Sequence, residues 1–105
     1  MSTFLTDVQG FTPIIDVMVK ELGLIPAAVY GRVWRYCQGE RGVCQASLET
    51  LADEVGLSTR TVQRHLHALA EAGYLEDTTP DLRNRPHTYR DTGRAKVIGL
   101  VAALG

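Results

Sequence analysis

The spacing of apolar and polar positions divides the chain into five helical segments and a short hairpin. Residues 48–55 carry apolar side chains at i, i+3, i+4 and i+7, and the next segment has an apolar stripe of Val62, Leu66 and Leu69. Ser47 and Ser58 are the predicted N-caps of these two helices, which span about 47–55 and 58–73. Because only Gly56-Leu57-Ser58 links the two helices, we expect them to cross steeply.

Two more helices are predicted before this pair. Thr12-Pro13 is a helix-start signal for a segment that ends before Gly23, and its apolar residues cover more than one stripe. Pro26 is predicted to open the next helix, which runs to about Cys37. Its apolar face has helical spacing and consists of Tyr30, Val33, Trp34 and Cys37. Residues 43–46 could form a small strand.

The pattern becomes extended after the fourth helix. Residues 74–77 and 87–91 are predicted strands, joined by the nine-residue polar loop TTPDLRNRP. This loop is longer than most hairpin connections, which suggests a functional role. A final helix is predicted at 94–104, with apolar residues at most of its positions.

Length and composition are those of one globular domain over residues 1–105, with 45% hydrophobic and 22% charged residues. The net charge is -1, but it is unevenly distributed. Residues 1–57 carry 4 basic and 7 acidic side chains (-3), whereas residues 58–105 carry 7 basic and 5 acidic ones (+2). This excess in the second half is weak support for an anionic partner. No signal peptide or membrane-spanning run is recognisable, so we expect a cytoplasmic protein without a membrane partner.

The fourth helix carries the candidate chemistry on its polar side. Arg and Gln can bind guanine and adenine edges bidentately, and the free N–H groups of a helix start can bind phosphate. The residues predicted to contact DNA from this helix are Ser58, Thr59, Arg60, Thr61, Gln63, Arg64 and His67. The alternative is a solvated outer face, since Arg and Gln are also good exposed helix formers.

The run S-T-R-T-V-Q-R-H-L, followed by L-x-x-x-G-Y-L, resembles the helix-turn-helix family. Ala52, Gly56 and Val62 fall at the intervals at which that family has a small residue, a turn glycine and a branched apolar residue. The following AEAGYLED, polar loop and PHTYRD resemble the wing of winged-helix domains. The resemblance covers about residues 26–91 and is closest to the domains of bacterial regulators and of phage or plasmid replication proteins.

The resemblance implies a mainly helical winged helix-turn-helix. Its helix-turn-helix would span about 47–73, its wing about 74–91, and flanking helices about 12–22 and 94–104. It also implies that Arg83, Arg85 and Arg90 of the wing contact phosphates or the minor groove, although Asp81 opposes this and a solvated loop is the alternative. The chain departs from the family at His65, where many members have an aliphatic residue, and in its low net charge.

Other chemistries have little support in the sequence. The spacing of Cys37 and Cys44 relative to the three histidines matches no compact zinc site, and buried, inert cysteines are the better interpretation. No phosphate-binding glycine loop, carboxylate pair or nucleophile motif is present. We therefore expect no enzyme activity, no catalytic residue, no metal and no cofactor.

The sequence thus predicts a sequence-specific double-stranded DNA-binding protein. Transcriptional control and recognition of a replication origin are both compatible with it. A winged-helix module that binds proteins is the alternative, and steep salt dependence would distinguish DNA binding from it. The apolar terminal helices further predict a homodimer.

Overall fold

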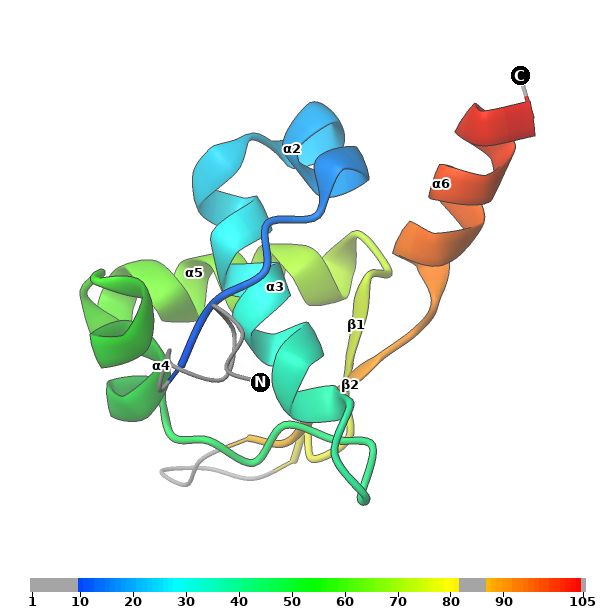
Figure 1. Cartoon of the computed structure of the whole chain (residues 1–105). Helices are drawn as coiled ribbons and strands as arrows, with labels where there is room; N and C mark the ends of the chain where they lie inside the picture. The colour runs from blue at the N-terminus through cyan, green and yellow to red at the C-terminus, as the bar shows by residue number, and fades with distance from the viewer. Residues whose placement is uncertain (1–9, 82–86, 105) are drawn as a thin grey trace, which may run out of the picture.

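The computed structural model describes residues 10–81 and 87–104, which form five helices and a two-stranded antiparallel hairpin. The helices are α2 (Asp16–Leu22), α3 (Leu24–Cys37), α4 (Leu48–Val55), α5 (Thr59–Glu71) and α6 (Arg94–Leu104). The strands are β1 (Leu75–Asp77) and β2 (Tyr89–Asp91). Helices α3, α4 and α5 pack on one another, the hairpin packs beside α3 and α5, and α6 projects away at the end (Figure 1).

The caps of α4 and α5 form as the sequence predicts. Ser47 Oγ accepts a hydrogen bond from the Thr50 N–H, and Ser58 Oγ accepts one from the Thr61 N–H, each at 3.1 Å. Gly56 ends α4 in the left-handed conformation, with φ 70°, which a residue with a side chain adopts only with strain. The three-residue link and the resulting helix pair are therefore confirmed.

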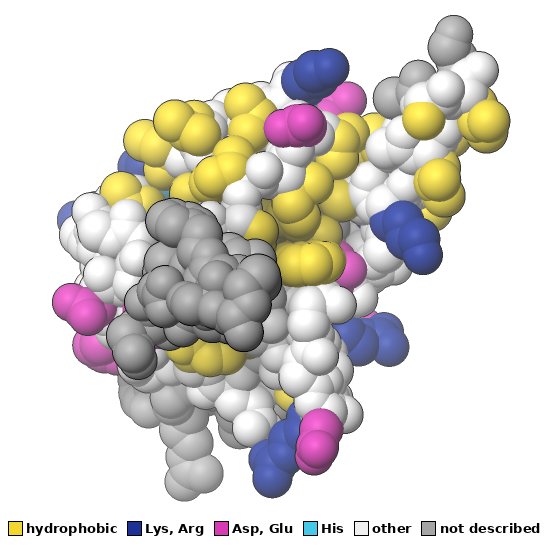
Figure 2. Space-filling view, in the orientation of Figure 1, with side chains coloured by type: hydrophobic (Ala, Val, Ile, Leu, Met, Phe, Trp, Pro, Cys, Tyr) yellow, Lys and Arg dark blue, Asp and Glu magenta, His cyan; other side chains and the backbone are white. Residues whose placement is uncertain are grey.

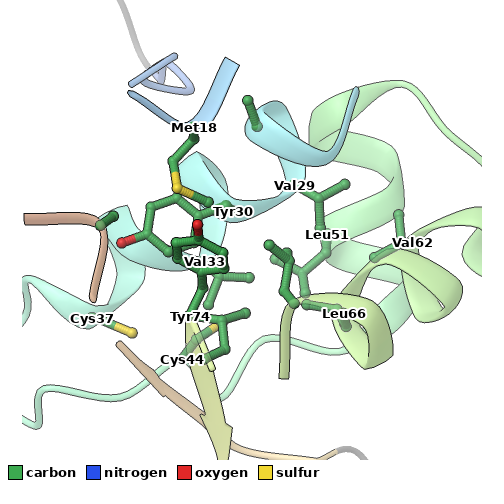
Figure 3. Close-up of a cluster of buried hydrophobic side chains, with 14 of the residues drawn as sticks. Met18, Val29, Tyr30, Val33, Cys37, Cys44, Leu51, Val62, Leu66 and Tyr74 are labelled. Atoms are coloured by element: carbon green, nitrogen blue, oxygen red, sulfur yellow. The ribbon is translucent and has the colours of Figure 1, made fainter. Parts of the chain in front are cut away.

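One hydrophobic core joins the helices to the hairpin (Figure 3). Val62 and Leu66 of α5 are fully buried, and they face α3 and α4. The Tyr30 hydroxyl donates to Asp91 Oδ1 at 2.8 Å and so ties α3 to β2, while burial raises the Tyr30 pKa above its ordinary value. These contacts set the position of the hairpin relative to α5.

The predicted start of the first helix is wrong. Helix α2 begins at Asp16, not at Pro13, and residues 10–15 belong to no helix or strand and cross α3 at Gly31. Arg32 and Arg35 each donate to the Phe11 carbonyl oxygen, at 2.7 and 2.6 Å, which holds this segment down. A Cβ on Gly31 would lie 1.8 Å from the Pro13 carbonyl oxygen, so only glycine allows this crossing.

Three smaller expectations are also corrected. Helix α3 begins at Leu24, so Pro26 occupies its third position, where a missing N–H costs no helical hydrogen bond. The predicted strand at 43–46 is reduced to one bridge between Cys44 and Tyr89. The two strands are shorter than predicted, although the Thr78 N–H still donates to the Thr88 carbonyl beyond them.

The fold class expected from the sequence is confirmed as a mainly helical winged helix-turn-helix with flanking helices. The cysteines behave as expected, since Cys37 and Cys44 are both buried free thiols. Burial raises the pKa of Cys44 to about 11, which keeps this thiol protonated and unreactive at neutral pH. Leu66, the neighbour of His65, is fully buried in the core.

Candidate nucleic-acid interface

Helix α5 separates its apolar and polar residues on opposite sides. Val62, Leu66 and Leu69 are at most 1% exposed, whereas the side chains on the other side are open to solvent. The exposed residues include Thr59, Arg60, Gln63, Arg64 and His67. Burial of the stripe fixes the rotation of α5 about its axis, so these polar side chains point away from the core.

A concavity of about 910 Å³ lies between α5 and the base of the hairpin. Five of the predicted contact residues line one wall, namely Arg60, Thr61, Gln63, Arg64 and His67. The first turn of α4 contributes Leu48 and Glu49 to another wall. The structure therefore gathers the side chains with base-reading chemistry in one open groove.

The opposite wall was not anticipated from the sequence. It consists of Asp77 at the end of β1, Tyr89 at the start of β2, and His87 two residues before β2. His87 Nδ1 lies 2.6 Å from Asp77 Oδ2, the Thr79 N–H donates to Asp77 Oδ1 at 2.9 Å, and the His87 ring stacks on Tyr89. Alternation along β1 and β2 could have placed Asp77 and Tyr89 on one face, but not on this side of α5.

The start of α5 offers both hydroxyl and backbone donors. Ser58 and Thr61 are hydrogen-bonded to each other. The Ser58 hydroxyl donates to Thr61 Oγ1 at 2.9 Å, and it also accepts the capping hydrogen bond from the Thr61 N–H. The N–H groups of Thr59 and Arg60 occupy the first two helical positions, where no intrahelical acceptor exists. They can bind a phosphate that approaches the helix end.

The charge of the groove is mixed. Arg60 and Arg64 are cationic, while Glu49 and Asp77 are acidic. Burial, together with the neighbouring Arg64, lowers the pKa of His65, so this residue is neutral at neutral pH. His67 Nε2 lies 3.1 Å from Glu71 Oε1, which places a carboxylate at the far end of the polar side.

The structure describes one of the three predicted wing arginines, Arg90, and Arg90 does not line the groove beside α5. Arg83 and Arg85 lie outside the described residues. Arg90 is exposed on the hairpin face opposite Asp77 and Tyr89, and it is paired with Glu76 of the neighbouring strand. Its predicted DNA contact stays a prediction, and it would require Arg90 to leave Glu76.

Comparison with known proteins identifies the fold independently. A family model described as a helix-turn-helix domain matches residues 20–75, which is more than half of the chain. The chain belongs to the helix-turn-helix domain family. Neither the curated proteins nor the solved structures contain a significant match to it.

The matched span of this helix-turn-helix domain covers α3 to the start of β1, and therefore the whole of α4 and α5. Membership places the chain among DNA-binding regulators in general. Within the described residues, no three His, Cys, Asp or Glu side chains are arranged to hold a metal ion. No described helix is long and apolar enough to cross a membrane.

Proposed function

We propose that this helix-turn-helix protein binds double-stranded DNA in a sequence-specific manner and acts by occupying its site, without catalysis or a cofactor. The observation that carries the proposal is the exposed polar side of α5, where Arg60, Gln63 and Arg64 line an open groove. A helix in this setting can enter the major groove with its N-terminal half leading. Bound there, it would block or recruit other machinery in the cytoplasm.

The roles divide between base reading and positioning. Arg60 and Arg64 can each donate two hydrogen bonds to guanine O6 and N7, and Gln63 can pair with adenine N6 and N7. Thr59 and the N–H groups of the first turn would hold a phosphate and thereby set the register of the helix. Control of transcription and recognition of a replication origin both use this type of complex. We propose that the protein has one of these two roles.

The experiment begins with selection from a random duplex library, followed by titration of the selected duplex over a series of salt concentrations. We expect affinity to fall steeply as salt rises, because each phosphate contact releases counterions. Arg60→Ala with Arg64→Ala should abolish selection, whereas Lys20→Ala on α2 removes one exposed cation far from the groove and should leave it intact. Failure to enrich any sequence, with salt-insensitive binding, would contradict the proposal.

A protein-interaction module is the second candidate. It is favoured by the exposed apolar side chains of the α2–α3 corner, where Leu24 is 61% and Ile25 49% exposed. A net charge of -1 also suits a protein partner better than a long duplex. The same salt series decides between the candidates, since an apolar interface is insensitive to moderate salt.

A further inference from the structure

Helix α6 is apolar on all sides, which is unusual for a helix at the surface. From residue 97 to 104 it has no charged or polar side chain. A helix that is hydrophobic all round is normally buried on all sides. In this chain α6 instead projects from the body, and only part of it contacts α2 (Figure 1).

One side of α6 already packs on its own domain. Ala95 is 4% exposed and Ile98 is partly buried against the core. At 100° per residue, the opposite side carries four large apolar side chains at i, i+3, i+4 and i+7. This outer stripe consists of Val97, Leu100, Val101 and Leu104, which are 59, 56, 64 and 89% exposed.

None of the described residues covers the outer stripe, because the stripe faces away from the part of the domain that packs on α6. Apolar side chains are visible along the free side of α6 in the space-filling view (Figure 2). We propose that the outer stripe is a homodimer interface, in which α6 packs antiparallel against the outer stripe of a second copy. A two-fold interface requires a surface that complements itself, and an uncharged apolar stripe meets this requirement.

The charges of α6 decide the orientation. Its two cations, Arg94 and Lys96, lie in the first turn, and the helix contains no acidic residue. Parallel pairing would gather four cations at one end. Antiparallel pairing places each pair of cations beside the C-terminal end of the partner helix, where the helix dipole is negative.

The size of the stripe sets the expected strength. It covers only about two turns of helix, which is a small contact compared with roughly 800 Å² per partner in stable complexes. We therefore expect association in the micromolar range. The inference does not rest on DNA binding, because the stripe lies on α6 and the base-reading residues lie on α5.

Light scattering of the DNA-free chain over low to high micromolar concentrations tests the interface. The mass should rise from 11.5 kDa towards twice that value. Leu100→Gln with Val101→Gln should remain monomeric throughout, with an unchanged circular dichroism spectrum. Leu24→Gln with Ile25→Gln, an equally exposed apolar pair, should dimerise like the wild type.

Engineered cysteines test the orientation. Under mild oxidation by oxidised glutathione, Leu100→Cys should form an intermolecular disulfide because it lies near the two-fold axis, whereas Val97→Cys should not because it faces Leu104 of the second copy. The native thiols should not interfere, since Cys44 is 1% and Cys37 9% exposed.

Three results would overturn the proposal. A monomer at every concentration excludes the dimer, and a dimer that survives the Leu100 and Val101 changes places the interface elsewhere. Preferential cross-linking through Val97→Cys shows parallel helices. None of these results tests base reading by α5, which the titration of the selected duplex measures separately.

Discussion

Arg64 is exposed, and its guanidinium group can bind a guanine edge. It lies on the side of α5 opposite the buried stripe and lines the groove. Its neighbour His65 is neutral at neutral pH, because burial and the Arg64 charge both lower the His65 pKa. His65 therefore adds no positive charge beside Arg64.

Replacing Arg64 by Ala should weaken binding to the selected duplex by about 1–3 kcal/mol and relax the preference at one base pair. The reason is the loss of a bidentate pair with a guanine edge. Competition titrations with duplexes altered at single positions measure both effects. Lys20→Ala removes the same charge from α2 and should change neither; equal behaviour of the two variants would exclude base reading by Arg64.

Glu54 holds α4 against α3 through an ion pair. Arg32 donates to both of its carboxylate oxygens, at 2.9 and 2.7 Å, and the Tyr36 hydroxyl donates at 2.9 Å. The hydrogen bonds from Arg32 lower the pKa of Glu54 below its ordinary value, despite partial burial. The folded state thus favours the ionised form of this carboxyl.

Glu54→Gln should lower the free energy of unfolding by about 1 kcal/mol at neutral pH. Because the folded pKa lies below the unfolded one, the stabilisation is complete above the unfolded pKa and is lost as pH falls through the folded pKa. Urea unfolding at neutral and at acid pH should therefore show a difference that shrinks on acidification. Asp53→Asn on the same helix serves as the control, and a cost that is equal at both pH values would contradict the role of the charge.

The hairpin is the element that shapes the second wall of the groove. Leu75 pairs with Asp91 and Asp77 with Tyr89, so Asp77 and Tyr89 share the face towards the groove. Asp77 is bonded to His87 and Thr79, which fixes the point at which the loop leaves β1. The loop that follows carries Arg83 and Arg85.

The double change Arg83→Ala and Arg85→Ala should weaken binding to all duplexes alike. Each phosphate contact that is lost should reduce the slope of log affinity against log salt by about 0.9. The slope is measured with the selected duplex and with an unrelated one, and Lys20→Ala, which removes one exposed cation from α2, is the control for a loss of charge away from the wing. An unchanged slope in the double variant would rule out phosphate contacts by these two arginines.

At the scale of the whole molecule, charge limits what one copy can do. The net charge is -1, and the groove contains carboxylates as well as arginines. One copy thus offers few phosphate contacts, whereas two copies joined through α6 would double them. Pairing through α6 would then strengthen the binding of the two α5 helices to DNA.

A two-fold dimer should select inverted half-sites, with centres one helical turn apart at ~34–36 Å or a multiple of it. Sequencing of the selected duplexes shows the repeat, and footprinting shows the spacing. The variant with Leu100→Gln and Val101→Gln should keep the half-site preference but bind the full site more weakly. Selection of single, unpaired sites by the dimer would contradict this arrangement.

The helix-turn-helix could be predicted because its determinants are local. Ser47, Gly56 and Ser58 satisfy or relax backbone groups within a few residues of themselves, and the Val62–Leu66–Leu69 stripe fixes which side of α5 is buried. Helix rotation follows from this stripe, so the exposed α5 residues could be named from the sequence. The apolar character of α6 is also legible in the sequence without any structure.

Only the tertiary structure decided the features that join distant parts of the chain. The late start of α2 depends on Arg32 and Arg35 bonding the Phe11 carbonyl from α3, and no local signal reports such a contact. The second wall of the groove depends on how the core seats the hairpin beside α5. Helical periodicity describes each element along its own axis; the packing between elements determines which of their exposed faces lie together.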